Sequence, residues 1–213
     1  MTTPIEKISE CAASIKGNFI DYTHEDGRLA SAIAEKPYLD RLQKITVEKY
    51  PNTTFEIKPP RSWCDFMVDE QPFNLKITEG KSADNAMNKL AIVYTLTGSF
   101  DGVRNTMNMN EMFQTIKNKG IKKERDKNSE YIYLVINKNS RDFICKSILD
   151  LKEYKTNPSN ILQINWKNEF ENKNYVCENH IEKIDELFLT IKKSEIQRQT
   201  TVTELMCWES WNI

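Results

Sequence analysis

The spacing of hydrophobic residues predicts that helices and short strands alternate along the chain. Near the N-terminus, Ile5, Ile8 and Ala12 recur at helical spacing, whereas the centre carries short apolar runs bounded by turn residues. Pro37 should kink or split the second helix, because proline cannot donate the backbone hydrogen bond of a helix interior. The pattern predicts helices over 4–16, 28–49, from 82 or 84 to about 96, 107–119, 148–154 and 180 to about 208, and strands over 53–58, 131–137, 143–147 and 161–166, with a strand pair over 64–78.

Helices at the two ends with strands between them are typical of an α/β protein. We expect a mixed central β-sheet flanked by helices. The chain has 213 residues, the length of one domain with a substantial core, and no internal repeat or low-complexity linker divides it. Residues 1–213 are therefore expected to form a single domain.

Residues 64–78 combine an apolar pattern with candidate chemistry. The second strand of this pair alternates an apolar set with a polar set: Phe73, Leu75 and Ile77 with Asn74, Lys76 and Thr78. Because side chains of a strand point alternately to its two faces, the two sets should lie on opposite sides of the sheet. The strand pair can also bring Asp65 close to Asn74 and Lys76. A carboxylate beside a lysine suits a divalent cation and phosphodiester chemistry.

This arrangement resembles the PD-(D/E)xK nuclease superfamily, to which most type II restriction endonucleases belong. The family signature is an aspartate, a short spacer and then acid-x-Lys, and here Cys64-Asp65 is followed, after eight residues, by Asn74-Leu75-Lys76. Cys64 stands where proline is usual, and Asn74 where Asp or Glu is usual, which removes a metal-binding carboxylate. The polar stretch 76–89 looks like the DNA-facing segment of restriction enzymes, and residues 157–166 resemble their late region.

The resemblance implies a restriction-endonuclease-like fold and a Mg²⁺-dependent site that hydrolyses phosphodiester bonds. Asp65 would bind the cation through a carboxylate oxygen, and Lys76 would contact the scissile phosphate or orient the attacking water. Asn74 would be a neutral metal ligand or a hydrogen-bonding group. Glu35, in the helix before the strands, would supply the missing charge, since some family members carry a metal-linked glutamate on such a helix. Three other glutamates compete for this role: Glu48, Glu56 and Glu79.

Each of these residues also has an ordinary structural explanation. Asp65 can simply open a hairpin, and Lys76 can be an edge-strand lysine that discourages aggregation. Most helix glutamates such as Glu35 are solvated. Residues 56–58, Glu-Ile-Lys, form a second acid-x-Lys, so the motif could lie in another register.

A group of polar donors follows the lysine strand and is expected to contact double-stranded DNA. Lysine suits phosphates, and asparagine can pair with adenine in the major groove. Asn85 is spaced three from Asn88 and four from Lys89, so all three would share a helix face. The start of a capped, solvated helix would look the same. The group comprises Lys81, Ser82, Asn85, Asn88 and Lys89. The basic stretch 117–127 could also grip phosphates or be a solvated loop.

Composition restricts the function classes without selecting one. Thirty basic and thirty-one acidic residues give a net charge of −1, which does not indicate a nucleic-acid binder, although a local groove can still carry a positive field. The five cysteines are scattered without CxxC spacing, so neither a zinc site nor a disulfide framework is expected. We expect the protein to be in the reducing cytoplasm. The sequence contains no GxxxxGK[ST], GxGxxG, HExxH or GxSxG motif, no apolar run of membrane-spanning length and no signal peptide pattern.

The sequence thus predicts a type II site-specific deoxyribonuclease that acts as a homodimer, because protein two-fold symmetry mirrors a palindromic site. A repair or structure-specific nuclease of the same superfamily is the first alternative. A catalytically silent DNA-binding module is the second, because Asn74 replaces an acid. A helical interaction protein unrelated to DNA is a remote third.

Overall fold

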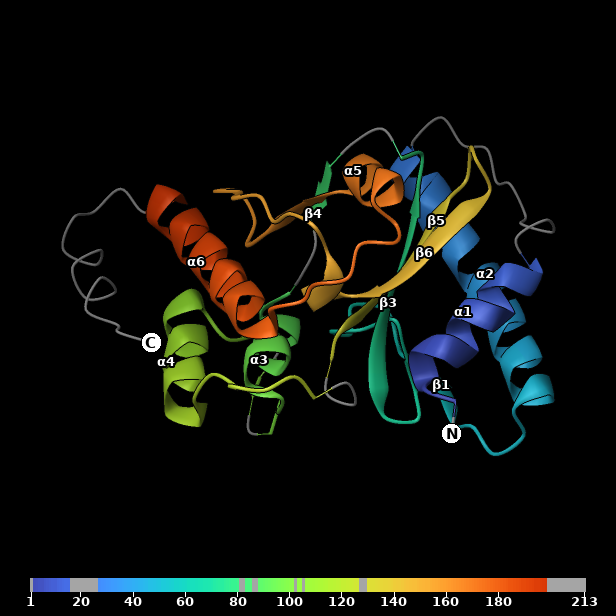
Figure 1. The fold of residues 1–213 in the computed structure, drawn as a ribbon, viewed down its shortest axis with the longest axis horizontal. Helices are drawn as coiled ribbons and strands as arrows, with labels where there is room; N and C mark the ends of the chain where they lie inside the picture. The colour runs from blue at the N-terminus through green and yellow to red at the C-terminus, as the bar shows by residue number, and fades with distance from the viewer. Residues whose placement is uncertain are drawn as a thin grey trace.

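The computed structural model describes residues 2–15, 27–80, 83–85, 88–101, 103–104, 106–126 and 130–198. A five-stranded mixed sheet in the order β1-β2-β3-β5-β6 lies between helices (Figure 1). This arrangement confirms the expected α/β fold with a mixed central sheet. Neighbouring strands are antiparallel except for β3 and β5, which are parallel. The strands are β1 (Phe55–Ile57), β2 (Phe66–Val68), β3 (Gln71–Thr78), β5 (Ile132–Asn137) and β6 (Asp142–Ser147).

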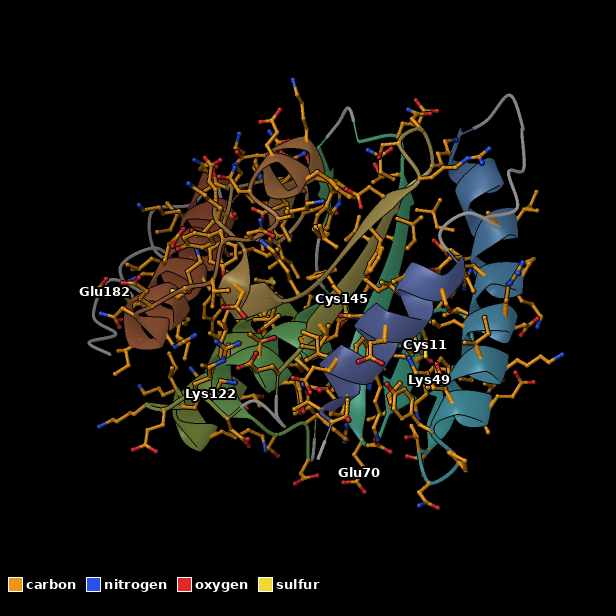
Figure 2. The ribbon with its side chains drawn as sticks, turned by 45° about the vertical axis from the view of Figure 1, so that its right-hand side comes forward. Cys11, Lys49, Glu70, Lys122, Cys145 and Glu182 are labelled. Atoms are coloured by element: carbon orange, nitrogen blue, oxygen red, sulfur yellow. The ribbon has the colours of Figure 1, made fainter. Side chains whose placement is uncertain are left out.

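Two N-terminal helices cover one face of the sheet (blue in Figure 1). Helix α1 (Pro4–Ile15) packs on β6, and α2 (Gly27–Lys49) packs on β3 and β1. Figure 2 shows Cys145 of β6 beside α1, and its Sγ lies 3.9 Å from the carbonyl oxygen of Ile5. Pro37 lies inside α2 and does not split it, contrary to one of the expected outcomes. The apolar residues of α1, α2 and this sheet face form one hydrophobic core.

The other face of the sheet packs against helices from the later part of the chain (green to red in Figure 1). These are α3 (Lys89–Thr97), α4 (Met109–Lys119) and α6 (His180–Arg198). Phe113 of α4 and Phe188 of α6 meet edge to face, with ring centroids 5.8 Å apart. Smaller elements complete this second core: β7 (Gln163–Asn165), the 3-10 turn η3 (Ile148–Asp150) and α5 (Trp166–Glu171). The short strand β4 (Ala83–Asn85) pairs with β7.

A two-residue turn sets the register of the β2–β3 hairpin. Asp69 and Glu70 both have positive φ, at 47° and 69°, which is typical of the tight turns that join twisted antiparallel strands. The Asp69 carboxylate accepts a hydrogen bond from the Thr54 amide at 2.9 Å and pairs with Lys7 at 2.7 Å. Figure 2 shows Glu70 at the tip of this hairpin. The turn therefore fixes which residues of β2 and β3 lie opposite each other.

Three predicted elements differ from the structure. The helix expected from residue 82 or 84 begins at Lys89 instead, with Asn88 as its N-cap, and residues 83–85 form β4. The helix expected over 148–154 is a single 3-10 turn, and the strand expected over 161–166 ends at Asn165, where α5 begins. The part of the last helix predicted beyond Arg198 lies outside the described residues.

A partly buried ion-pair network joins segments of the second core. The Arg125 guanidinium hydrogen-bonds Glu130, just before β5, and its Nη2 lies 2.6 Å from Asp150 Oδ2 in η3. It also contacts His180, the first residue of α6. Asp150 Oδ1 accepts a further hydrogen bond from the Cys177 amide at 3.1 Å. One guanidinium thus connects the segment after α4 to the sheet and to the last helix.

Candidate functional site

Asp65 immediately precedes β2 and lies where β3 continues beyond its pairing with β2. β2 pairs with β3 through Gln71, Pro72 and Phe73, whereas β3 runs on to Thr78. The Asp65 amide donates to the Phe73 carbonyl at 2.9 Å, and its carboxylate accepts a hydrogen bond from the Leu75 amide at 2.7 Å. The Asp65 side chain therefore replaces a strand partner for Leu75 and is held beside β3.

The polar and apolar residues of β3 face opposite sides, as predicted. Leu75 packs in the core under α1 and α2. Asn74 and Lys76 are partly exposed and lie in register with Tyr133 and Val135 of β5, whose side chains belong to the second core. The Asp65 carboxylate, bonded to the Leu75 amide, is thus next to the β3 segment that carries Asn74 and Lys76.

Glu35 of α2 interacts electrostatically with Asp65 and Lys76. Burial raises the pKa of Glu35 to about 6; the nearby Asp65 charge raises it further, and Lys76 opposes both effects. Burial also raises the pKa of Asp65, against the Leu75 hydrogen bond and the charge of Lys76. No direct ion pair joins the three side chains, but each lies within electrostatic range of the other two. We call Glu35, Asp65, Asn74 and Lys76 the carboxylate–lysine site.

Asn74 carries a buried amide oxygen that lacks a partner. Among the described residues, nothing hydrogen-bonds its Oδ1. A buried polar atom without a partner costs about 1–3 kcal/mol. Such an atom calls for a specific explanation, of which a bound ion or water is one.

The carboxylate–lysine site offers oxygen donors but no closed metal cage. Across the part of the chain that the structure describes, no three His, Cys, Asp or Glu side chains are arranged to hold a metal ion. The site instead offers the carboxylates of Glu35 and Asp65 and the amide oxygen of Asn74. These are hard oxygen ligands, and Mg²⁺ is commonly held by one or two carboxylates while keeping several waters.

The competing glutamates are engaged elsewhere. Glu56 lies 2.6 Å from Lys58, so the second acid-x-Lys is an ion pair at the end of edge strand β1. Glu79 pairs with Lys138 at 3.3 Å, and Glu48 with Lys44 at 4.0 Å on the surface of α2. Glu35 is therefore the best placed of the four glutamates to add negative charge beside Asp65.

The structure does not bring the predicted DNA-contacting residues together on a helix face. Lys81 and Ser82 lie outside the described residues, and Asn85 belongs to β4. Asn88 caps α3, accepting a hydrogen bond from the Ala91 amide at 2.9 Å, and Lys89 Nζ donates to the Met107 carbonyl at 2.6 Å. The prediction of a shared helix face was wrong because the helix begins later than expected.

The basic stretch 117–127 is also less available than its composition suggests. Residues 117–119 are the end of α4, and Arg125 is held by Glu130 and Asp150. Burial lowers the pKa of Lys122. A continuous phosphate-binding strip is therefore not supported over 117–126, the described part of this stretch.

Sequence reasoning missed the aromatic residues beside the site. Tyr131 donates to the carbonyl of Trp63 at 2.8 Å, and the Trp63 ring lies 5.2 Å from Tyr94 and 5.1 Å from Phe100 between centroids. Phe100 is 40% exposed. Tyr131 was expected only as part of a buried strand, and no local pattern indicated its hydrogen bond to Trp63.

Comparison with models of known families, with curated proteins and with solved structures gave no significant match. The functional argument therefore rests on the geometry of the carboxylate–lysine site. None of the helices within the described residues is both long and apolar enough to span a bilayer.

Proposed function

We propose that the protein is a Mg²⁺-dependent endonuclease that hydrolyses phosphodiester bonds of double-stranded DNA. The observation that carries this proposal is that Glu35 of α2, Asp65 just before β2 and Lys76 of β3 lie within electrostatic range of one another. Two carboxylates with a lysine beside them are a combination suited to holding a cation and stabilising a phosphate.

Each residue of the site has a distinct task in this proposal. Asp65 and Glu35 hold the cation through carboxylate oxygens, and the Asn74 amide oxygen is a neutral ligand or accepts from a coordinated water. A bound Mg²⁺ supplies Lewis acidity, which activates water and neutralises phosphate charge. The Lys76 ammonium stabilises the negative charge that develops on the phosphate oxygens as the bond to the leaving oxygen breaks.

The finer proposal is a type II restriction enzyme that acts as a homodimer at a short sequence. It rests on the resemblance of Asp65 and Asn74-Leu75-Lys76 to the PD-(D/E)xK motif. Cleavage of both strands of a palindrome requires two sites related by two-fold symmetry. A cytoplasmic location would fit both this role and the scattered cysteines.

A plasmid cleavage assay with Mg²⁺ tests the proposal. We expect Asp65→Asn and Lys76→Met each to lose about 100-fold or more in cleavage rate, because each removes a charge that acts in the transition state. Asparagine is chosen at position 65 because its amide oxygen can still accept from Leu75. Lys58→Met is the matched control, since Lys58 is the lysine of the competing acid-x-Lys.

Equal cleavage by the wild type and Asp65→Asn would remove Asp65 from the mechanism. Loss of activity in Lys58→Met but not in Lys76→Met would place the motif in the other register. Discrete fragments from linear duplex DNA would support a restriction enzyme, whereas a preference for mismatches or junctions would support a repair or structure-specific nuclease.

A catalytically silent DNA-binding module is the second candidate, and Asn74 is the observation that favours it. A neutral amide stands where an acid is usual in the motif, which weakens metal binding relative to a carboxylate. Such a module would shift a DNA duplex in a gel and leave it uncut with Mg²⁺ or Mn²⁺.

A further inference from the structure

The turn between β5 and β6, residues 138–141, lies at the same end of the sheet as the last residues of β3 (Figure 1). Because β3 and β5 are parallel, their carboxyl ends meet there, with Thr78 opposite Asn137. In open α/β sheets, ligands bind outside the carboxyl ends of parallel strands. Lys76 of the carboxylate–lysine site is two residues before this end of β3, which is about 7 Å along a strand. The turn is therefore a near neighbour of the proposed catalytic lysine.

Hydrogen bonds hold this turn against the end of β3. The Lys138 amide donates to the Thr78 carbonyl at 2.9 Å, and the Asn139 side chain donates to the Glu79 carbonyl at 3.1 Å. Within the turn, the side-chain oxygen of Asn137 accepts from the Asn139 amide at 3.0 Å. The position of the turn relative to β3 is therefore set by the fold and does not depend on a ligand.

Arg141 closes the turn in a backbone conformation that arginine rarely adopts. Its φ is 56°, in the left-handed region that favours glycine and asparagine. A residue with a long side chain is strained there, and the exposed side chain of Arg141 recovers little of that cost by packing. Strained residues of this kind cluster at binding and catalytic sites. The strain at Arg141 therefore favours a role in binding.

The charge of Arg141 is not neutralised by a neighbouring carboxylate. Two acids flank the turn, Glu79 and Asp142, and each pairs with a lysine: Glu79 with Lys138 at 3.3 Å, and Asp142 with Lys173 at 3.1 Å. Within the described residues, no ion pair joins Arg141 to a carboxylate. The two lysines offset the two acids, so the charge of Arg141 remains and suits an anionic partner.

We propose that the β5–β6 turn contacts the phosphate backbone of duplex DNA and that Arg141 pairs with one phosphate. The inference rests on the proposed nuclease function and adds a surface that positions the substrate beside Lys76. The separation of about 7 Å between Lys76 and the turn equals about two base-pair steps of B-DNA, at about 3.4 Å per step. Arg141 thus reaches a phosphate close to the scissile one. A guanidinium suits this contact because it can bind a phosphate through two parallel hydrogen bonds.

The test measures binding of a short fluorescein-labelled duplex by anisotropy at several NaCl concentrations. EDTA is present, so that the readout depends neither on the cation site nor on turnover. The slope of log affinity against log salt reports the number of phosphates contacted. We expect Arg141→Asn to weaken binding and to reduce the size of this slope by about 1. The same substitution should raise the urea midpoint, because asparagine tolerates the left-handed conformation better than arginine.

Two further variants separate the role of the turn from general effects of charge and strain. Arg141→Lys keeps the positive charge and should keep the slope. Arg61→Asn is the matched control, because Arg61 is also exposed and also has a positive φ, 69°. It lies between β1 and β2, on the side of the sheet opposite β5 and β6. We expect Arg61→Asn to raise the urea midpoint and leave the slope unchanged.

Three outcomes would overturn the inference. An unchanged slope in Arg141→Asn, with the wild type binding the duplex, would show that no phosphate lies at the turn. Equal reductions in Arg141→Asn and Arg61→Asn would show that net charge, and not the turn, determines binding. Absence of duplex binding by the folded wild type would remove the DNA partner itself and count against the proposed function as well, whereas the first two outcomes leave that function standing.

Discussion

At the residue scale, Glu35 is held in a place that disfavours its charge. Burial and the nearby Asp65 raise its pKa to about 6 from an ordinary value of 4.5. Because the folded state then binds the proton more tightly than the unfolded state, folding stability falls as pH rises from 4.5 through 6. A solvated structural glutamate would not have a raised pKa, whereas strongly shifted pKa values are typical of functional sites.

Glu35→Gln should therefore stabilise the protein at neutral pH while it impairs cleavage. We expect a gain of about 1 kcal/mol in the free energy of unfolding at pH 7.5 and almost none at pH 4, where Glu35 is protonated in both states. Urea unfolding at the two pH values measures this difference. Glu48→Gln, on the exposed surface of the same helix, is the control and should show no gain. A Glu35→Gln variant that is less stable at pH 7.5 would contradict the prediction.

The sequence could predict part of this site because strand alternation is a local rule. The opposite faces of Leu75 and Lys76 follow from the period of two, and the nearness of Asp65 follows from a tight hairpin. The unpartnered oxygen of Asn74 could not be predicted, because the surroundings of Asn74 depend on the parallel pairing of β3 and β5. No local pattern specifies that pairing.

At the element scale, the N-terminus of α3 shows how a helix start can be misplaced. Ser82, Asp84 and Asn88 are all suitable N-cap residues, so residue preference alone does not choose among them. The three-residue strands β4 and β7 are too short to carry a hydrophobic pattern, and their pairing places the helix start after residue 85. Helices α1, α2 and α4 and the β2–β3 hairpin, by contrast, were predicted to within a few residues.

The cap and a DNA contact make different demands on Asn88. Asn88→Ala should lower the free energy of unfolding by about 1 kcal/mol, since it leaves the Ala91 amide without its acceptor. Asn88→Asp should retain that stability, because aspartate is an equally good cap, and its added negative charge should weaken DNA binding if the residue faces DNA. Urea unfolding and DNA gel shifts measure the two effects. Unchanged stability of Asn88→Ala would argue against the capping role.

At the scale of the whole molecule, the sheet separates two hydrophobic cores, and the Arg125 network holds together the outer parts of the second one. The fold class was predictable from the order of elements, but this network was not. Arg125 lies in the basic stretch 117–127, whose composition predicted either a phosphate-binding segment or a solvated loop. Its actual partners, Glu130, Asp150 and His180, come from three separate segments.

Arg125→Met should destabilise the protein by about 3 kcal/mol, because it leaves the carboxylates of Glu130 and Asp150 together without their cation. Lys123→Met removes an exposed positive charge from the same stretch and should change stability by less than about 0.5 kcal/mol. Equilibrium unfolding in urea compares the two variants. Similar stabilities would mean that the Arg125 pairs behave as ordinary surface contacts.

The alternation of polar and apolar residues along β3 also disfavours a one-residue slip in strand register, which would misplace Lys76. A slip of one residue against β5 would turn Lys76 into the hydrophobic core under α2 and place Leu75 on the face that now carries Asn74 and Lys76. The misregistered form would be too unstable to persist, so molecules that survive folding carry the lysine on its proper side. The strand register that stabilises the fold would then also fix the proposed catalytic arrangement. Mutations that permit slippage should lower the fraction of active molecules and leave the cleavage rate of each active molecule unchanged.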